Sequence, residues 1–300
     1  MDGVFMPDAI GFIGLGIMGS PMAANLVKAG FDVAGHTRSR AGLDRLAAAG
    51  GRPVTGLAEA VTGADVVITM LPDSPDVEQV ILGPDGVLAH ARPGTLLIDM
   101  STIRPRTARA VAAAAADRGL RPLDAPVSGG EQGAVEGVLS IMVGGAAADF
   151  EAAGPVLSAL GTTIVHVGPS GAGQTVKAAN QLVVAGTIQL LAEAIVLLEA
   201  SGVDAHAGLQ VLAGGLAGST VLDRKGAGML ARTFTPGFRS DLHHKDLGIM
   251  LDAAREAGAV VPVGALLGQL MAALRAQGDG GLDHTALLLA TERMSGRTHD

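Results

Sequence analysis

The sequence predicts a two-domain α/β protein, in which a parallel sheet with helices between its strands is followed by an all-α domain. The length of 300 residues is about twice that of a typical domain. Over residues 1–165, short Val/Ile/Leu runs alternate with Ala-rich helical stretches, as in βαβ units. From residue 171 onward, helical periodicity replaces this alternation. The breaker cluster 168–173 separates the two patterns, so we expect domains at 1–170 and 171–300.

Each expected strand is a short apolar run, and each expected helix is the amphipathic stretch between two runs. The expected strands are 9–14, 31–35, 65–70, 95–100, 121–125, 139–144 and 163–167. The helices between them are 18–29, 41–49, 75–82, 105–118 and 147–160. The second part is expected to form helices 174–200, 204–212, 220–229, 241–257, 262–276 and 283–294. The first of these would be about 40 Å long and apolar on most of its circumference, as a core helix is.

Charge, aromatic content and cysteine content exclude several classes of protein. A net charge of −8 argues against nucleic acid as a partner and against membrane binding through a basic surface. The chain has no Trp or Tyr to stack on bases. It has no Cys, which excludes disulfides, thiolate nucleophiles and Cys-based metal sites and is compatible with the cytoplasm.

The most apolar stretch, 181–200, is interrupted by Gln189, Glu193 and Glu199, so it is not expected to span a membrane. The first eight residues contain no basic segment of a signal peptide. We therefore expect a cytoplasmic protein without a membrane partner.

A glycine motif with the spacing G-x-G-x-x-G follows the first expected strand and opens the first expected helix. Gly14 allows a tight turn, Gly16 allows the backbone to approach a pyrophosphate, and Gly19 allows close packing of helix on strand. The helix N-terminus then offers free N–H groups to phosphates. The context predicts a Rossmann-type dinucleotide site formed by Gly14, Leu15, Gly16, Ile17, Met18 and Gly19.

The end of the second expected strand predicts which dinucleotide binds there. An NAD site usually has an acidic residue at this point to hold the ribose hydroxyls. This chain instead has Thr37, Arg38, Ser39 and Arg40 after His36, which offer guanidinium and hydroxyl groups to a 2′-phosphate. We therefore expect NADP, with NAD as the alternative.

The first turns of helix 174–200 contain a lysine in an apolar context. Only four of the 21 basic residues are lysines, and Lys177 lies three residues before Asn180, one of two asparagines. Residues at this spacing share a helix face. A partly desolvated ammonium can release its proton, whereas a guanidinium cannot. Lys177 is therefore a candidate acid/base, and the alternative is a lysine with its charge extended to the surface.

Two further segments have the composition of ligand loops. Ser128, Gly129 and Gly130 follow the strand 121–125 and can present a hydroxyl and backbone N–H groups to a carboxylate. Segment 238–247 contains Lys245 in a helical stretch. Its adjacent histidines, His243 and His244, point to different helix faces, so no metal site is expected.

Four motifs in order resemble those of the β-hydroxyacid dehydrogenase family, which includes 3-hydroxyisobutyrate dehydrogenase. They are Gly11–Gly19, Asp124–Gly130, Gly171–Asn180 and Lys245–Leu247, and they extend over most of the chain. The resemblance implies a Rossmann-type domain joined by a long helix to an all-α domain. One departure is Thr37, where family members that prefer NAD often have Asp.

The resemblance also implies the roles of single residues. Lys177 would be catalytic with Asn180 beside it, and the substrate would be held by Ser128, Gly129 and Gly130. Lys245 would line the cleft of cofactor and substrate. The loops after two further strands would contact the cofactor through Met70, Leu71, Pro72, Ser101 and Thr102.

The expected reaction is reversible hydride transfer between NADP(H) and a small 3-oxo carboxylate, a semialdehyde. Alternatives are 3-hydroxyisobutyrate or succinic or glyoxylic semialdehyde as substrate, or a dinucleotide-binding module without catalysis. The presence of both Lys177 and Asn180 argues against the last alternative. The apolar C-terminal helices exceed what one small α domain can bury, so a homodimer or homotetramer is expected.

Overall fold

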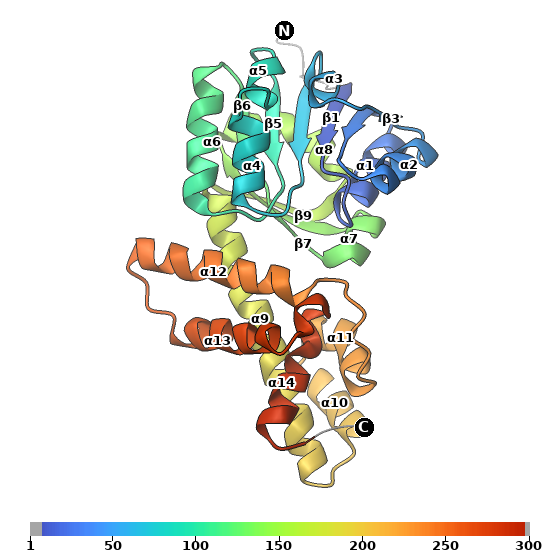
Figure 1. Ribbon diagram of the computed structural model, residues 1–300, viewed down its shortest axis with the longest axis vertical. Helices are drawn as coiled ribbons and strands as arrows, with labels where there is room; N and C mark the ends of the chain where they lie inside the picture. The colour runs from blue at the N-terminus through green and yellow to red at the C-terminus, as the bar shows by residue number, and fades with distance from the viewer. Residues whose placement is uncertain (1–7, 298–300) are drawn as a thin grey trace. The chain divides into compact units, whose positions relative to one another are not determined.

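The computed structural model describes residues 8–297 (Figure 1). The chain divides into two compact units, Met1–Lys177 and Ala178–Asp300. The first unit ends and the second begins within one helix, α9 (Ala172–Ala200). This point lies a few residues after residue 170, where we expect the first domain to end, and the expected domain bounds stay a prediction. The segment examined for a signal peptide lies, apart from Asp8, outside the described residues.

The first unit is built on one nine-stranded sheet (Figure 1). Six strands run parallel, in the order β3 (Arg52–Pro53), β2 (Asp32–His36), β1 (Ala9–Ile13), β4 (Val66–Thr69), β5 (Leu96–Asp99) and β6 (Arg121–Asp124). Strand β1 pairs with both β2 and β4, so the strand order changes direction beside it. In such doubly wound sheets, ligands bind beyond the carboxyl ends of the strands at this point.

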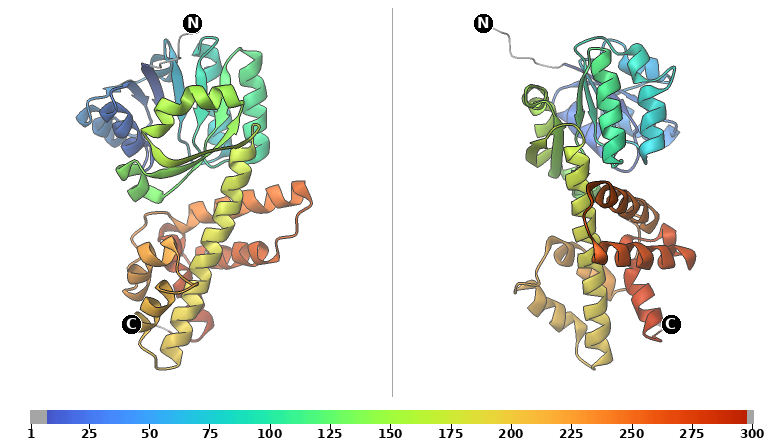
Figure 2. Two further views of the ribbon diagram at one scale, coloured as in Figure 1. Left: turned by 180° about the vertical axis from the view of Figure 1, so that it is seen from behind. Right: turned by 90° about the vertical axis from the view of Figure 1, so that its left-hand side faces the viewer.

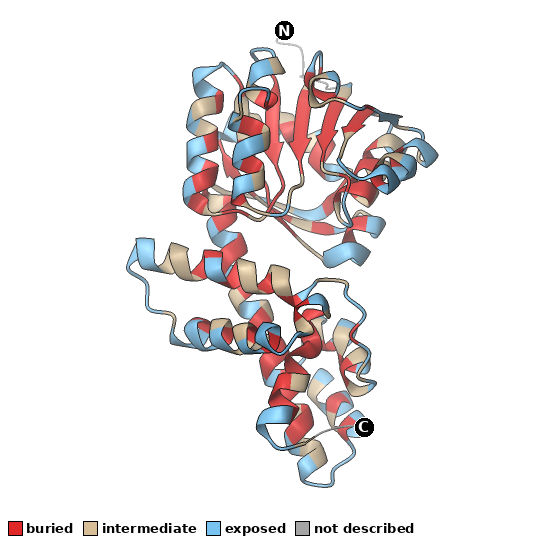
Figure 3. Ribbon diagram, viewed as in Figure 1, coloured by how far each residue is buried: buried red, intermediate tan, exposed pale blue. Residues whose placement is uncertain are grey.

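The alternation of side chains along the strands divides the apolar residues between two cores. Ile68 belongs to the core covered by one set of helices, and its neighbour Val67 belongs to the core on the other face. The first set is α1 (Gly19–Lys28), α2 (Arg40–Ala48) and α8 (Ala147–Ser158). The second set is α3 (Leu57–Val61), α4 (Ser74–Leu82), α5 (Val87–His90) and α6 (Pro105–Asp117). Figure 3 shows the central strands buried between the two layers.

The expectation of a parallel sheet is correct for five of these strands, β3 was not expected, and the end of the sheet departs from the parallel arrangement. Strand β8 (Leu139–Gly145) runs antiparallel to β6 and to the two-residue β7 (Val127–Ser128). β9 (Gly161–Gly168) then pairs parallel to β8. The chain between β6 and β8 contains β7 and only seven residues of helix, α7 (Gly130–Glu136). Because β7 pairs with β8 itself, the chain turns back instead of crossing over the sheet.

The second unit is helical, as expected. Its helices are the later part of α9, then α10 (Ala205–Ala213), α11 (Thr220–Leu230), α12 (Ser240–Ala257), α13 (Pro262–Ala276) and α14 (Leu287–Met294). Their buried side chains form one core that includes Ile188, Met250 and Met271. The expected helix 283–294 begins instead with a 3-10 turn, His284–Ala286, which is capped by the Asp283 carboxylate, an acceptor for Thr285 N.

Helix α9 has 29 residues, which gives a length of about 44 Å at 1.5 Å per residue. Within the described part of the chain, it is the one helix long and apolar enough to cross a membrane. This is weak evidence for a membrane span, because a core helix passes the same test and 44% of its most apolar window is buried within the protein.

Candidate active site

The glycine motif forms the expected turn between β1 and α1. Gly14 has φ +102°, and a Cβ there would lie 2.2 Å from Met70 O. A Cβ on Gly19 would lie 1.9 Å from Gly14 O, so only glycine allows this packing. A Cβ on Gly16 would meet nothing within 4 Å, and the residue is exposed. Helix α1 begins without a side-chain cap, so an open loop and free N–H groups fit a dinucleotide pyrophosphate.

The residues after β2 differ in whether their side chains form hydrogen bonds or ion pairs within the protein. Arg38 is exposed, and among residues 8–297 its guanidinium has no hydrogen bond or ion pair. Arg40 instead begins α2 and pairs with Asp44 at 3.0 Å. Ser39 precedes the helix, and its N–H points to Thr37 Oγ1 at 3.5 Å. Arg38, Thr37 and Ser39 are therefore the polar groups best able to receive a 2′-phosphate.

The loops after β4 and β5 are joined by a buried network. Thr69 Oγ1 and Ser101 Oγ both donate to Asp99 Oδ1, at 2.7 and 2.6 Å. Leu71 N in turn donates to Ser101 Oγ at 2.9 Å. The Ser101 hydroxyl is fully buried and used within the protein, so its role is to fix the loop that carries Met70, Leu71 and Pro72. Thr102 follows in a loop whose backbone is fixed by Gln174.

Gln174 was missed by the sequence analysis. Its side chain donates to Ser101 O at 2.8 Å and accepts from Ile103 N at 3.0 Å, so one amide satisfies both sides of this loop. The signal available in the sequence was a single glutamine in the first turn of a long apolar helix. That signal does not say which loop the amide will meet.

Asp124, at the end of β6, holds the start of α9. Its carboxylate accepts from Gly171 N at 2.6 Å and Gln174 N at 3.0 Å, two otherwise unsatisfied N–H groups of the helix end. Burial raises the pKa of Asp124 to about 6, against the opposing effect of these two hydrogen bonds, and Asp99 adds to the rise. Glycines surround the carboxylate: a Cβ on Gly144 would lie 2.6 Å from Oδ1.

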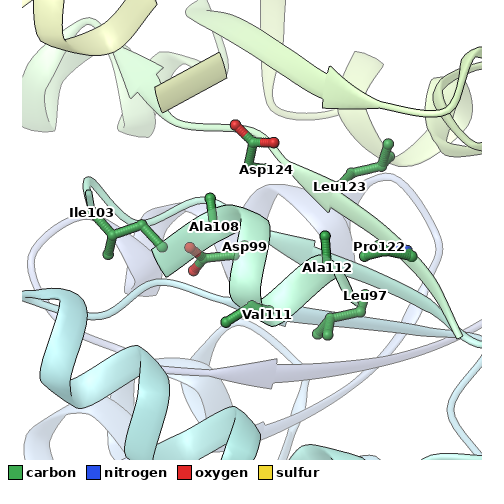
Figure 4. Close-up of a pocket in the computed structure, with 9 residues that line it drawn as sticks. All are labelled: Leu97, Asp99, Ile103, Ala108, Val111, Ala112, Pro122, Leu123 and Asp124. Carbon is green, nitrogen blue, oxygen red and sulfur yellow. The ribbon is translucent and has the colours of Figure 1, made fainter. Parts of the chain in front are cut away.

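Asp99 and Asp124 also line a small internal pocket whose other walls are apolar (Figure 4). Its volume is ≈ 10 Å³, room for about one water molecule. The pocket is therefore far too small for a nucleotide or a substrate.

Lys177 is buried, with 7% of its surface exposed, and its Nζ donates to Val127 O at 2.7 Å. This carbonyl directly precedes Ser128, so the structure brings the candidate acid/base to the candidate carboxylate loop within the first unit. Gly129 and Gly130 have φ +143° and +65°, and a Cβ on Gly130 would meet nothing within 4 Å. Gly130 is exposed, so the loop leaves the backbone accessible at this residue.

Asn180 lies three residues after Lys177 on α9 and belongs to the second unit. Its Nδ2 donates to Gln181 Oε1 at 2.9 Å, and Gln181 Nε2 donates to Asp246 Oδ2 at 2.5 Å. Lys245 Nζ lies 2.8 Å from Asp246 Oδ1. The two candidate residues of the second unit, Asn180 and Lys245, are thus linked through Gln181 and Asp246, which the sequence analysis did not single out.

Of the two histidines of segment 238–247, His243 packs in the core, and His244 lies 3.0 Å from Arg275 through its Nδ1. His243 is fully buried, and its Nδ1 lies 2.9 Å from His284 Nδ1. The ring of Phe238 meets both imidazoles edge-on, at 5.7 and 5.5 Å. Within residues 8–297, no three His, Asp or Glu side chains are grouped as metal ligands would be.

Most of the chain matches two families of nicotinamide-binding domains. Residues 9–168 match the NAD binding domain of 6-phosphogluconate dehydrogenase, and residues 171–291 match the NAD-binding domain of NADP-dependent 3-hydroxyisobutyrate dehydrogenase. With the open glycine loop at the switch point of the sheet, these matches define an NAD(P)-binding oxidoreductase.

Individual relatives are similar over nearly their full length. The chain is 41% identical to the 2-hydroxy-3-oxopropionate reductase of Escherichia coli K12, over 95% of this chain and 98% of that protein. It is 42% identical to an NAD-dependent L-serine dehydrogenase of Pseudomonas aeruginosa, over 90% and 93%. The solved structure of Mycobacterium tuberculosis 3-hydroxyisobutyrate dehydrogenase with L-serine superposes with a TM-score of 0.86 at 39% identity, covering 95% of this chain and 99% of that one. The chain belongs to the β-hydroxyacid dehydrogenase family, and its cofactor is a nicotinamide dinucleotide.

Proposed function

We propose that the protein catalyses the reversible, NADP(H)-dependent reduction of a small 3-oxo carboxylate, such as 2-hydroxy-3-oxopropionate, to the hydroxy acid. The observation that carries the proposal is the buried ammonium of Lys177 beside the loop of Ser128, Gly129 and Gly130. An acid and a carboxylate-binding loop side by side suit a short substrate with a carbonyl close to its carboxylate.

The reduced nicotinamide, when bound, supplies the hydride that adds to the aldehyde carbon. Lys177 gives a proton from Nζ to the carbonyl oxygen, which becomes the hydroxyl group, and it takes that proton back in the reverse direction. General acid catalysis of this kind contributes about 10²–10⁴-fold to the rate. The Ser128 hydroxyl and the N–H groups of Gly129 and Gly130 bind the carboxylate. Asn180 orients the substrate hydroxyl.

The preference for NADP is supported by Arg38. Its exposed guanidinium is at the end of β2, where a carboxylate would repel a 2′-phosphate, and no carboxylate stands there. We assign Gly14–Gly19, Thr37, Arg38, Ser39, Met70–Pro72, Ser101, Thr102 and Lys245 to the cofactor, with Ser101 acting through its loop.

The choice of 2-hydroxy-3-oxopropionate is supported by segments 214–223 and 236–239, which look most like those of its reductases, and by the Escherichia coli relative. The names of other relatives supply the alternatives, L-serine and 3-hydroxyisobutyrate. Initial rates with NADPH and NADH test the proposal. The panel holds 2-hydroxy-3-oxopropionate, succinic semialdehyde and glyoxylic semialdehyde in one direction and L-serine and 3-hydroxyisobutyrate in the other. If kcat/KM is highest with L-serine or 3-hydroxyisobutyrate, that compound replaces 2-hydroxy-3-oxopropionate as the proposed substrate. If no combination of substrate and cofactor is turned over, the proposal is wrong.

We further propose that α9 pairs with α9 of a second copy of the chain. Val183, Leu190 and Leu197 are each about two-thirds exposed and recur every seven residues, the period of helix-on-helix packing. In an antiparallel pair centred on Leu190, Val183 meets the partner's Leu197, and Gly186 meets the partner's Ala194, small against small. The two copies of Glu193 then lie about 9 Å apart along the axis. Figure 2 (left) shows this part of α9 in front of α12 and α13, with no helix of its own unit over it.

The cytoplasmic location stays a prediction.

A further inference from the structure

A single buried carboxylate connects the two site residues of the second unit. Asp246 is 2% exposed and faces α9 from α12. Its Oδ2 accepts from Gln181 Nε2 at 2.5 Å, and its Oδ1 lies 2.8 Å from Lys245 Nζ. A charge so far from water is stable only when it is paired and hydrogen-bonded, and both conditions are met here by groups adjoining the proposed site.

The carboxylate determines which way two amides point. An ionised carboxylate accepts hydrogen bonds and donates none, so Gln181 must turn its NH₂ group towards Asp246. Its carbonyl oxygen then faces Asn180 and requires a donor, which is Asn180 Nδ2 at 2.9 Å. Asn180 is thereby left with its oxygen, Oδ1, and the second N–H of Nδ2 as the groups to offer a ligand. An acceptor at this place suits a substrate hydroxyl, which donates.

The other oxygen of Asp246 holds Lys245. The ion pair at 2.8 Å does not have the angle of a hydrogen bond, and no described residue donates a hydrogen bond to Oδ1. Attraction between the two charges therefore restrains the ammonium of Lys245. The lysine side chain is 19% exposed, so its head is close to the surface of the unit.

The backbone of Gln181 is fastened as well. His243 Nε2 lies 3.2 Å from Gln181 O, and since a carbonyl only accepts, His243 must carry its proton on Nε2. His243 Nδ1 then accepts, and His284 Nδ1 donates to it at 2.9 Å. Two residues of α12, His243 and Asp246, thus fix one residue of α9 by its main chain and by its side chain.

We propose that Asp246 is a positioning residue of the active site, which orients Asn180 through Gln181 and restrains Lys245 directly. The proposal rests on the function proposed above. The proposal has two arms. In the Gln181 arm, Asp246 acts through Gln181 to orient Asn180 as an acceptor for the substrate hydroxyl. In the Lys245 arm, Asp246 holds Lys245 in place to bind an anionic ligand.

Two variants separate the arms. Gln181→Leu removes the link to Asn180 and leaves the Asp246–Lys245 pair, so kcat should fall about tenfold or more with NADPH affinity unchanged. In Asp246→Asn, the new amide can still accept from Gln181, and its NH₂ group faces Lys245. NADPH should then bind about tenfold more weakly, or KM for the carboxylate should rise by that factor, with kcat within a few-fold.

The matched control is Gln189→Leu, another buried glutamine of α9, which donates to Glu193 at 2.9 Å and Thr291 at 3.1 Å and has no link to Asn180. NADPH affinity is measured by fluorescence titration, independently of turnover, and Tm is measured for all three variants. If Gln181→Leu and Asp246→Asn change kcat, KM and NADPH affinity no more than Gln189→Leu does, Asp246 is structural and the proposal is wrong. Absence of dehydrogenase activity in the wild-type protein would instead overturn the proposed function.

Discussion

Replacement of Lys177 should remove turnover while leaving the cofactor site intact. The side chain is 7% exposed, and its Nζ donates to Val127 O at 2.7 Å. Lys177→Met keeps the volume of the stem and removes the proton donor, so kcat should fall about 10²-fold or more. NADPH affinity should stay close to wild type, because the glycine loop and Arg38 are untouched.

The same substitution has a stability cost that the assay must separate from chemistry. Val127 O loses this donor, and an unsatisfied buried carbonyl costs about 1–3 kcal/mol. Rates are therefore measured well below the Tm of each variant, and the folded fraction is counted by NADPH titration. Lys177→Arg keeps the charge and the donors but cannot release a proton, so it should not restore kcat. A Met variant within a few-fold of wild type, or an active Arg variant, would refute the role of Lys177.

Arg38→Ala should lower kcat/KM for NADPH about ten- to a hundredfold and leave NADH nearly unchanged, because a charge-assisted contact contributes about 1.5–3 kcal/mol. Arg40→Ala is the matched control, since Arg40 is paired with Asp44, and a wild type that prefers NADH would contradict this assignment. Burial by itself would raise the pKa of Asp283, but His284, Lys225 and hydrogen bonds hold it at about 2, below the ordinary 3.8. Asp283 should thus contribute about 2–3 kcal/mol of stability above pH 3.8 that is lost as the pH falls towards 2; thermal unfolding of Asp283→Asn should show a weaker loss over this range, and an unchanged pH dependence would count against the shift. Leu190→Cys, in a chain without cysteine, should form a covalent dimer with a short bismaleimide, and Leu190→Glu should shift sedimentation towards the monomer. Val211→Cys, also exposed but on α10, serves as the cross-linking control, and equal cross-linking of both would argue against the α9 pair.

Periodicity predicted most of the elements because the apolar pattern is local. The runs that form β4 and β5 are buried on both faces. The helix that the sequence predicts from residue 174 begins at Ala172, only two residues earlier. The glycine motif could likewise be interpreted from its context, since the turn itself requires the positive φ of Gly14 and the close contact of Gly19 with Gly14 O. What the sequence did not show is pairing over long distances.

Asp124, Gln174, Gln181 and Asp246 have ordinary local surroundings, and each acquires its function from a partner on another element. The two-residue β7 and the short α7 were missed because so few residues cannot show a periodic pattern of apolar side chains. The two arginines expected after β2 also differ in their contacts: Arg40 pairs with Asp44, four residues later on the same helix, and Arg38 has no such partner in the described part of the chain.

The cap that Asp124 places on α9 has a consequence for the order of folding. Its hydrogen bonds to Gly171 and Gln174 join residues 47 and 50 positions apart, with β7, β8, β9, α7 and α8 in the closed loop. Closing such a loop costs entropy before any contact repays it. The middle of α9 can therefore form with neighbouring helices early, while its first turn is completed only after the last strands have paired. In pulse-labelled hydrogen exchange, the amides of Gly171 and Gln174 should gain protection later than that of Ile188, on the same helix.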